Sequence, residues 1–229
     1  MSQSTYQIRQ CTDQNCRLRF PVPLDERLGQ RCPRCRGSTV VVATVNAPSE
    51  RSDEAGGSTP TAGPCLPIEA LLDNVRSLFN VGSIFRSADG AGLRRLHLCG
   101  ITPTPENPKL AKTALGAEQG VAWRYHTNAL EAIRQARSEG YTIWGLEEQI
   151  GAESLFTVTL PTQPLLLIVG SEVTGVDPGI LQLCDKIVAI PMYGVKRSLN
   201  VATAFGVAAV ILSQRCHDQS PNNQSPNHD

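Results

Sequence analysis

The sequence predicts an α/β protein built on a parallel sheet, with a small metal-binding module before it. Three observations lead to this prediction. Helix-like and strand-like segments alternate between residues 67 and 216, which is typical of a parallel sheet. The segment 165–170 is apolar throughout, as strands covered on both faces are. Four of the eight cysteines lie within residues 11–35, which indicates a separate ligand cluster.

The alternation begins with residues 67–77, PIEALLDNVRS, which predict a short helix. Residues 80–92 predict a loop that enters a second helix, which ends at its two glycines. Short apolar runs then predict strands, and an intervening PGILQLCD predicts a short helix. The predicted strands are 96–100, 141–147, 165–170 and 186–192, and the short helix is 178–185.

Capping residues delimit two longer helices. Asn128 is the candidate N-cap of a helix over 128–139, and Glu131 stands where a capping-box carboxylate belongs. Gly140 is its candidate stop. Ser198 is the candidate cap of the last helix, 198–216. The apolar face of that helix is predicted from Leu199, Ala202, Phe205, Val210 and Leu212.

A linker separates the module from the larger domain. Its sequence, NAPSERSDEAGGSTPTAGP, is almost bare of large apolar side chains, so it buries too little surface to offset the entropy of ordering. The length of 229 residues leaves room for one sizeable domain and a small module. The predicted division is a zinc-ribbon-like module at 1–45, a flexible linker at 46–64, the main domain at 65–216 and a disordered tail at 217–229.

Composition argues against a membrane protein. Apolar residues make up 41% of the chain and charged residues 18%, and no apolar run reaches the roughly 20 residues that span a bilayer. The first ten residues contain no signal-peptide core, so a cytoplasmic location is expected. The net charge is zero, but residues 1–45 carry seven arginines against three acidic residues. Four thiolates on one Zn²⁺ would reduce that surplus to about +2, a modest RNA-facing patch.

The clustered cysteines follow the spacing C-x4-C-x15-C-x2-C. Two such turns complete a tetrahedral four-thiolate shell, and a segment this short with few aromatic residues needs that support to fold. The four predicted ligands leave no open position on the metal, so the site is structural: Cys11, Cys16, Cys32 and Cys35. The alternative is four reduced thiols in a disordered arm. The module is expected either to widen an RNA footprint or to serve as a protein-docking or stabilising element.

The remaining candidate ligands have no ligand spacing. A chain without a secretion signal is also a poor candidate for a disulfide scaffold. We therefore interpret the other cysteines and two central histidines as packing or surface residues: Cys65, Cys99, Cys184, Cys216, His97 and His126.

Three motifs carry a functional prediction. They are NVGSIFRSA at 80–88, VGSEVTG at 169–175 and IPMYGVKRSLNVA at 190–202. In this order and spacing they resemble the three signature motifs of the SpoU/TrmH family of SPOUT methyltransferases. The resemblance covers about residues 67–215, and the third motif is the most specific.

The resemblance implies a C-terminal trefoil knot formed by about residues 165–213, and S-adenosylmethionine bound there in a bent form. It also implies methyl transfer to a ribose 2′-hydroxyl of tRNA or rRNA, by a homodimer whose knots pack together. An ordinary dinucleotide fold is not indicated, because Gly90-Ala-Gly92 is not completed by a glycine at position 95, which is arginine.

The cofactor site is expected where glycines follow strand ends, since the backbone must turn sharply there and approach a ligand closely. Apolar side chains would supply its walls. The predicted cofactor-binding residues are Gly170, Glu172, Gly175, Ile190, Met192, Gly194, Ser198 and Leu199.

By resemblance, Arg86 is the catalytic residue, surrounded by Asn80, Glu172, Ser198 and Asn200. A guanidinium stays protonated in proteins, so we expect Arg86 to clamp a phosphate and stabilise charge on the 2′-oxygen rather than act as a base. The hydroxyl proton would leave through phosphate, water or Glu172. The alternative for Glu172 is a structural acceptor of loop amides.

Further RNA contacts are expected from a loop at 107–118 and from residues beside the pocket. With Arg86, the candidates are Lys112, Thr113, Lys196 and Arg197. Two other functions remain open: an RNA base methyltransferase of the same superfamily, and a non-catalytic RNA-binding protein. The motif-one arginine together with Ser-Leu-Asn at 198–200 favours the ribose type.

Overall fold

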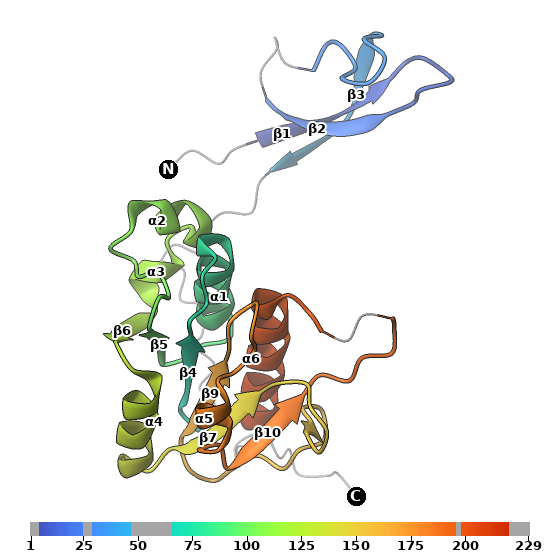
Figure 1. Ribbon diagram of the computed structural model, residues 1–229. Coiled ribbons are helices and arrows are strands. Elements are labelled where there is room, and N and C mark those ends of the chain that lie inside the picture. The colour runs from blue at the N-terminus through green and yellow to red at the C-terminus, as the bar shows by residue number, and fades with distance from the viewer. Residues whose placement is uncertain (1–4, 25–28, 47–65, 196–197, 220–229) are drawn as a thin grey trace, which may run out of the picture. The chain divides into compact units, whose positions relative to one another are not determined.

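The computed structural model describes residues 5–24, 29–46, 66–195 and 198–219. The chain divides into two compact units, Met1–Pro60 and Thr61–Asp229 (Figure 1), and each is described by itself. Most of the predicted linker and tail lies outside the described residues. The last helix continues to Asp218, two residues into the predicted tail.

The N-terminal unit is a three-stranded antiparallel sheet with the strand order β2-β1-β3. A register shift interrupts the pairing of β1 with β3 between Ile8 and Arg9. Among the described residues of this unit, Cys11 and Cys32 are the only hydrophobic side chains that are buried. The sheet therefore has no apolar core of its own. The strands are β1 Thr5–Cys11, β2 Arg19–Pro23 and β3 Thr39–Asn46.

The C-terminal unit contains a seven-stranded sheet with the order β6-β5-β4-β9-β7-β10-β8. Every pairing in it is parallel, which confirms the predicted fold class. The predicted strands agree with β5, β7, β9 and β10 to within three residues. The strands are β4 Ile68–Asp73, β5 Arg95–Cys99, β6 Ala122–His126, β7 Thr142–Leu146, β8 Glu153–Ser154, β9 Leu165–Val169 and β10 Lys186–Ala189.

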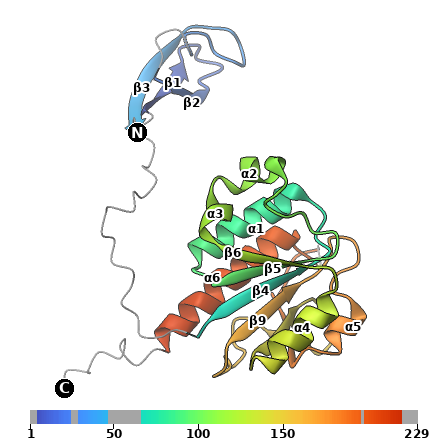
Figure 2. The ribbon, with the colours of Figure 1, turned by 90° about the vertical axis from the view of Figure 1, so that its left-hand side faces the viewer.

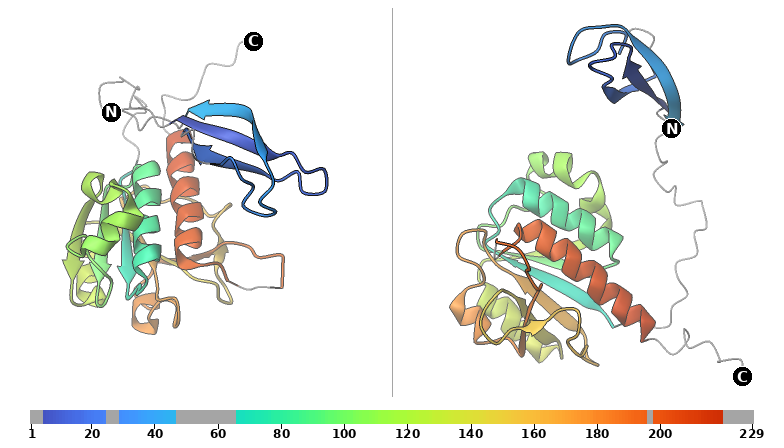
Figure 3. Two further views of the ribbon diagram at one scale, coloured as in Figure 1. Left: turned by 90° about the horizontal axis from the view of Figure 1, so that it is seen from above. Right: turned by 90° about the vertical axis from the view of Figure 1, so that its right-hand side faces the viewer.

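Helices cover both faces of this sheet, as Figures 2 and 3 show. One layer holds α1, α2, α3 and α6, and buries Phe85 and Phe205 against Trp144. The other holds α4 and α5, and packs Ile133 on Leu71. No helix in the described part of the chain is both long and apolar enough to cross a membrane. The helices are α1 Leu78–Gly90, α2 Pro108–Ala114, α3 Ala117–Gly120, α4 Ala129–Ser138, α5 Pro178–Leu181 and α6 Val201–Asp218.

The predicted helix at 67–77 is wrong, because Ile68–Asp73 forms strand β4 in the middle of the sheet. All six residues are buried, since β4 pairs with β5 and β9 and has a helix layer on each face. An apolar run covered on both faces has no alternation, so its spacing also fits a helix. The predicted loop at 107–118 is likewise wrong, since most of it is helical in α2 and α3.

Helix starts differ from two of the predictions. Helix α1 begins at Leu78, earlier than expected, and Ser77 is its N-cap. Helix α6 begins at Val201, and its cap is Asn200 rather than Ser198, because the Asn200 Oδ1 accepts from the backbone N–H groups of residues 202 and 203. Asn128 caps α4 as predicted. Leu199 and Val210 do not join the buried face of α6, since they are 38% and 57% exposed.

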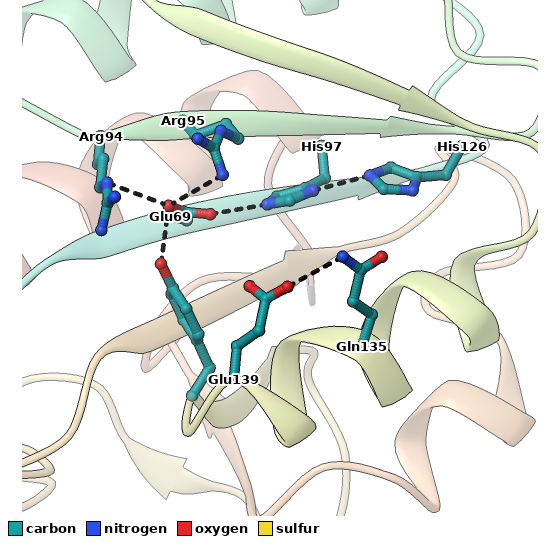
Figure 4. A network of polar contacts seen from close by, with 8 residues as sticks. Glu69, Arg94, Arg95, His97, His126, Gln135 and Glu139 are labelled. Carbon is teal, nitrogen blue, oxygen red and sulfur yellow. Dashed lines mark hydrogen bonds and ion pairs between the residues drawn. The ribbon is translucent and has the colours of Figure 1, made fainter.

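A polar network crosses the sheet next to the α4 layer (Figure 4). Glu69, only 2% exposed, accepts from the Tyr141 hydroxyl at 2.8 Å and lies 2.8 Å from His97 Nε2. The other ring nitrogen of His97 lies 2.9 Å from His126 Nε2. The two histidines are thus packing residues, as predicted, but packing residues that hold a buried carboxylate.

Candidate active site and cysteine cluster

A cavity of about 470 Å³ lies at the carboxyl ends of β7, β9 and β10. This edge of a parallel sheet is the usual ligand site of open α/β folds. Three chain segments line the cavity. They contribute Leu146, Glu147 and Glu148, then Val169 to Val173 with Gly175, then Ala189, Ile190, Met192, Ser198 to Val201 and Ala204.

The second segment is a tight turn after β9. Ser171 and Gly175 form two backbone hydrogen bonds with each other, of 3.0 and 2.9 Å. Gly175 has a φ of +69°, the left-handed region that favours glycine. A Cβ atom at Gly170 would collide with the Gly175 carbonyl group and the Val176 nitrogen. Gly170 is therefore required by close backbone approach and Gly175 by its left-handed conformation, so both glycines serve the sharp turn that was predicted after this strand.

Glu147 anchors this turn, although sequence analysis did not single it out. Its carboxylate accepts from the backbone N–H of Val176 at 2.8 Å and from that of Glu148 at 3.2 Å. Gly175 leaves room for this carboxylate, because a Cβ atom there would collide with it. The available signal was an acidic pair, Glu147-Glu148, directly after an apolar strand.

Glu172, Asn80 and Asn200 form one hydrogen-bonded chain. The Asn80 side-chain amide donates to Glu172 Oε1 at 2.9 Å, and the Asn200 amide donates to Asn80 Oδ1 at 3.1 Å. These residues are up to 120 positions apart in the sequence. The structure thus brings three of the five predicted catalytic residues together beside the cavity.

Both oxygens of Glu172 are occupied. Oε2 accepts from the Arg76 N–H at 3.0 Å, and Oε1 accepts from the Ser77 N–H at 3.1 Å in addition to Asn80. Burial raises the pKa of Glu172, but these hydrogen bonds outweigh burial and hold the pKa below its usual value. A carboxylate held in this way is a weak base, so the geometry favours the structural-acceptor alternative.

The third motif supplies the outer wall. Ile190 and Met192 are half-buried at the cavity, while Ser198 and Leu199 are exposed at its rim. Gly194 lies outside the cavity lining, and a Cβ atom there would meet nothing within 4 Å. Close approach therefore gives no reason for glycine at position 194 within this chain.

Arg86 does not line the cavity. It is exposed on α1, and among the described residues no hydrogen bond or ion pair holds its guanidinium. Phe79, which is 74% exposed, lies on the same side of α1, because positions seven apart share a helix face. Arg86 thus lies on a different face of α1 from Asn80, which is hydrogen-bonded to Glu172 and Asn200.

The other predicted RNA contacts have mixed positions. Lys112 is exposed on α2. Thr113 instead packs against Gly82, and its hydroxyl donates to the carbonyl groups of Leu78 and Leu110 at 3.2 and 2.8 Å. It therefore joins α2 to α1. Lys196 and Arg197 lie outside the described residues.

The residues of the cavity suit S-adenosylmethionine. Its described lining contains three carboxylates, from Glu147, Glu148 and Glu172, and no lysine, arginine or histidine. Apolar side chains and open backbone groups make up the rest. A volume near 470 Å³ is in the range of small-molecule sites. Such a lining matches a ligand that combines a cationic centre with a flat aromatic ring.

The four clustered cysteines meet in the N-terminal unit, with their sulfur atoms all within 4.8 Å of one another. Cys11 Sγ lies 3.4 Å from Cys35 Sγ, and Cys16 Sγ lies 3.7 Å from Cys32 Sγ. Burial raises the pKa of Cys11 to about 12, whereas hydrogen bonds from the backbone of residues 35 and 34 outweigh burial at Cys32 and lower its pKa to about 7. Amides that stabilise a thiolate are what a metal-binding turn needs.

Comparison with known proteins agrees with this geometry. Residues 67–210 match the SpoU rRNA Methylase family. The chain is 33% identical over 145 residues to a tRNA (guanosine(18)-2′-O)-methyltransferase of Thermus thermophilus, covering 63% of this chain and 72% of that one. It is 31% identical over 141 residues to the 23S rRNA (guanosine-2′-O-)-methyltransferase RlmB of Photorhabdus laumondii, covering 62% of this chain and 57% of that protein.

A solved structure is also similar. The AdoMet-bound rRNA methyltransferase of Sinorhizobium meliloti superposes with a TM-score of 0.62 at 25% identity. The alignment covers 66% of this chain and 57% of that chain. Most of the C-terminal unit is matched, motifs two and three line the cavity, and Asn80 of motif one is hydrogen-bonded to Glu172 and Asn200 in that lining, so the chain belongs to the SpoU methylase family.

Proposed function

We propose that this protein is an S-adenosylmethionine-dependent RNA 2′-O-ribose methyltransferase. One observation carries the proposal. The glycine turn at 170–175 lines a cavity with an acidic rim, and Glu172 in that turn is hydrogen-bonded to Asn80 of the first motif, which bonds to Asn200 of the third. Relatives of this family carry the same activity on tRNA and on 23S rRNA.

We further propose that the C-terminal segment, about residues 165–213, forms the trefoil knot of this family. Convergence supports it, since loops after β7, β9 and β10 all line one cavity. Helix α6 then packs against α1, with Ser213 donating to the Ala91 carbonyl at 2.7 Å.

The protein's task in this reaction is to position the ribose and to stabilise charge. The cofactor supplies a methyl group on a sulfonium. The glycine turn gives the cofactor open backbone, and Glu147 keeps that turn in place. Asn80 and Asn200 hold each other, which leaves the exposed Ser198 hydroxyl to meet substrate at the rim. Positioning of this kind lowers the barrier by removing entropy that the reaction would otherwise lose.

Arg86 would stabilise negative charge that grows on the 2′-oxygen and clamp a neighbouring phosphate. It is not a base, because a guanidinium stays charged. Glu172 is not the proton acceptor either, since both its oxygens accept N–H groups. The proton would leave through a substrate phosphate or through water.

A homodimer would bring these parts together. Arg86 shares an exposed face of α1 with Phe79, and Val210 of α6 is also exposed. We propose that this face packs on a second copy and that Arg86 acts in the partner's site. Mixing inactive Arg86→Ala and Asn200→Ala chains should then restore activity to part of the dimers. If the mixture stays inactive although the chains exchange, Arg86 acts within its own subunit.

The cysteine cluster is proposed to bind one structural Zn²⁺. Its four sulfur atoms lie within 4.8 Å of one another, so together they would complete the four-thiolate shell of a zinc ion and leave no position for substrate. Metal analysis of the purified protein should give one zinc per chain.

The function is tested with labelled S-adenosylmethionine and total RNA from a strain lacking the protein. Nucleoside mass spectrometry should find the label on ribose, and mapping then identifies tRNA or rRNA. Arg86→Lys should lower kcat about 100-fold, because an ammonium cannot replace the bidentate fork. Label on a base would favour the base methyltransferase, and failure to bind the cofactor in a calorimeter would favour a non-catalytic RNA-binding protein.

A further inference from the structure

Positive charge is concentrated in the N-terminal unit. Its described residues include six arginines and one acidic residue, Asp13. Residues 66–219, which contain the cofactor cavity, carry thirteen lysines and arginines against fourteen acidic residues. A polyanion as large as RNA therefore meets no net attraction from the C-terminal unit. Over residues 1–45 the full sequence has seven arginines and three acidic residues, and the surplus remains positive, at about +2, after a loaded four-thiolate zinc site subtracts two charges.

Three of these arginines surround the cysteine cluster. Arg17 directly follows Cys16, and Arg34 and Arg36 flank Cys35. Neighbouring Cα atoms are about 3.8 Å apart and the four sulfur atoms lie within 4.8 Å of one another, so the backbones of all three arginines lie close to the cysteine cluster. Arg17 and Arg36 also have equivalent backbone positions, with φ values of +45° and +63° after the last cysteine of each turn.

These three side chains are exposed and unpaired among the described residues. No ion pair is found in residues 5–24 and 29–46, where Arg9 bonds to Thr39 and Arg31 to the Arg36 carbonyl. Oδ1 of Asp13 accepts from the N–H groups of Asn15 and Cys16, at 2.8 and 3.3 Å. That carboxylate therefore shapes the first cysteine turn.

We propose that Arg17, Arg34 and Arg36 form a phosphate-binding tip that recruits the RNA substrate. This inference rests on the proposed function, because it takes RNA as the substrate. Guanidinium groups bind phosphates with two parallel hydrogen bonds, and unpaired ones give up no other partner to do so. The tip favours RNA over a protein partner because it is positively charged and carries no large exposed apolar side chain. The exposed valines of this unit lie on β3 instead.

The test compares RNA affinity of the full, zinc-loaded chain with that of Arg17→Gln/Arg34→Gln/Arg36→Gln. The probe is a fluorescein-labelled RNA hairpin of mixed sequence, measured by anisotropy over a series of salt concentrations. Three lost phosphate contacts should weaken binding on the order of 50-fold at physiological salt and reduce the slope of log K against log salt by about 2. Glutamine removes the charge and keeps a polar side chain, and at the positive φ of positions 17 and 36 it has the same Cβ atom as arginine.

A matched pair of single variants controls for net charge. Arg36→Gln should weaken RNA binding about fourfold. Arg134→Gln removes the same charge from the exposed face of α4 and should have almost no effect. Zinc content and cofactor affinity should stay unchanged in all variants, which excludes unfolding as the cause.

Unchanged RNA affinity and salt slope in the triple variant would overturn the proposal. The exposed β3 face would then be the surface to test for a protein partner. Failure of the proposed function has a different signature, namely a wild-type chain that binds RNA through the tip but neither binds cofactor nor methylates. If both proposals hold, the triple variant should raise the KM for RNA and keep kcat at saturating RNA.

Discussion

The two units of the chain are each stabilised by a different kind of interaction. In the described N-terminal residues the buried hydrophobic side chains are two cysteines, Cys11 and Cys32. In the C-terminal unit a parallel sheet is buried between two helix layers, each with its own apolar cluster. Hydrophobic burial is proportional to area, so it stabilises the second unit and contributes little to the first. A small sheet without a core needs another source of stability, and the proposed zinc at the cysteine cluster would supply it.

Removal of the predicted metal ligands tests this difference with the largest expected effect. Cys32→Ser/Cys35→Ser should unfold the N-terminal unit, because structural zinc contributes about 10 kcal/mol or more to domains of this kind. The C-terminal unit should keep its thermal transition and its cofactor affinity. Amide dispersion in an NMR spectrum reports the first effect, and calorimetry reports the second. Dispersed amides from residues 5–46 in the variant would mean that the sheet folds without metal.

The C-terminal unit, like the proposed metal site, has buried polar groups that need partners. Glu69 is 2% exposed and is held by Tyr141 and His97, with Arg94 and Arg95 each 3.6 Å away. Glu69→Ala leaves these partners unpaired and should lower the free energy of unfolding by about 3–5 kcal/mol. Urea denaturation measures the loss.

Glu139→Ala is the control for that measurement. Glu139 is exposed and accepts from Gln135 at 2.9 Å, as Figure 4 shows beside the buried network. Its removal should cost less than about 0.5 kcal/mol. Equal losses in the two variants would mean that the buried network adds nothing beyond an ordinary surface contact.

Sequence reasoning was strongest where spacing or motif determines geometry. The cysteine spacing places four sulfurs together, and hydrogen bonds join Asn80 of the first motif to Glu172 and Asn200 of the two motifs that line the cavity. It was weakest where only tertiary context decides. A six-residue apolar run such as Ile68–Asp73 fits a helix or a strand equally well until its neighbours in the sheet are known.

Partners of single polar residues were also beyond reach. Glu69 lies in that misassigned segment, and its partner His97 follows 28 positions later with no ligand-like spacing. Asn200 was assigned to the site, but its capping bonds to residues 202 and 203 depend on where α6 begins. Element boundaries shift by a few residues in such predictions, and a cap depends on a single position.

Two glycines of the predicted cofactor site differ in how closely the chain packs around them. Gly170→Ala places a Cβ atom against the backbone of Gly175 and Val176, which cannot move aside as a side chain can. We expect a loss of about 2–3 kcal/mol in stability and a much weaker cofactor affinity. Gly194→Ala meets nothing within 4 Å and should change stability by less than about 0.5 kcal/mol. Denaturation and calorimetry on both variants test this, and similar losses would contradict the proposed role of the turn.

The smallest expected effect is a pH dependence of the stability of the C-terminal unit. Burial, His97 and Arg124 lower the pKa of His126 from 6.5, so the unfolded chain binds a proton first as the pH falls. Stability should therefore decrease from about pH 6.5 downwards. Burial raises the pKa of Glu69, but bonds from His97 and Tyr141 outweigh it and hold the pKa below 4.5, so its contribution is lost as the pH falls further.

The alkaline side has the opposite sign. Burial and the bond to Glu69 raise the pKa of Tyr141 from 10.0 to about 12, and burial raises the pKa of Cys184 from 9.0 to about 11 and that of Cys99 from 9.0 to about 12. These groups ionise first in the unfolded chain, so stability should decrease above about pH 9. Denaturation curves across pH measure both limits. His126→Gln should remove the part of the acid dependence that begins near pH 6.5 and leave the alkaline part unchanged, because only the imidazole titrates there. If stability still decreases from about pH 6.5 downwards in His126→Gln, another group titrates in that range. The contacts that join Glu69 to His126 through His97 would then not be the cause of the acid dependence.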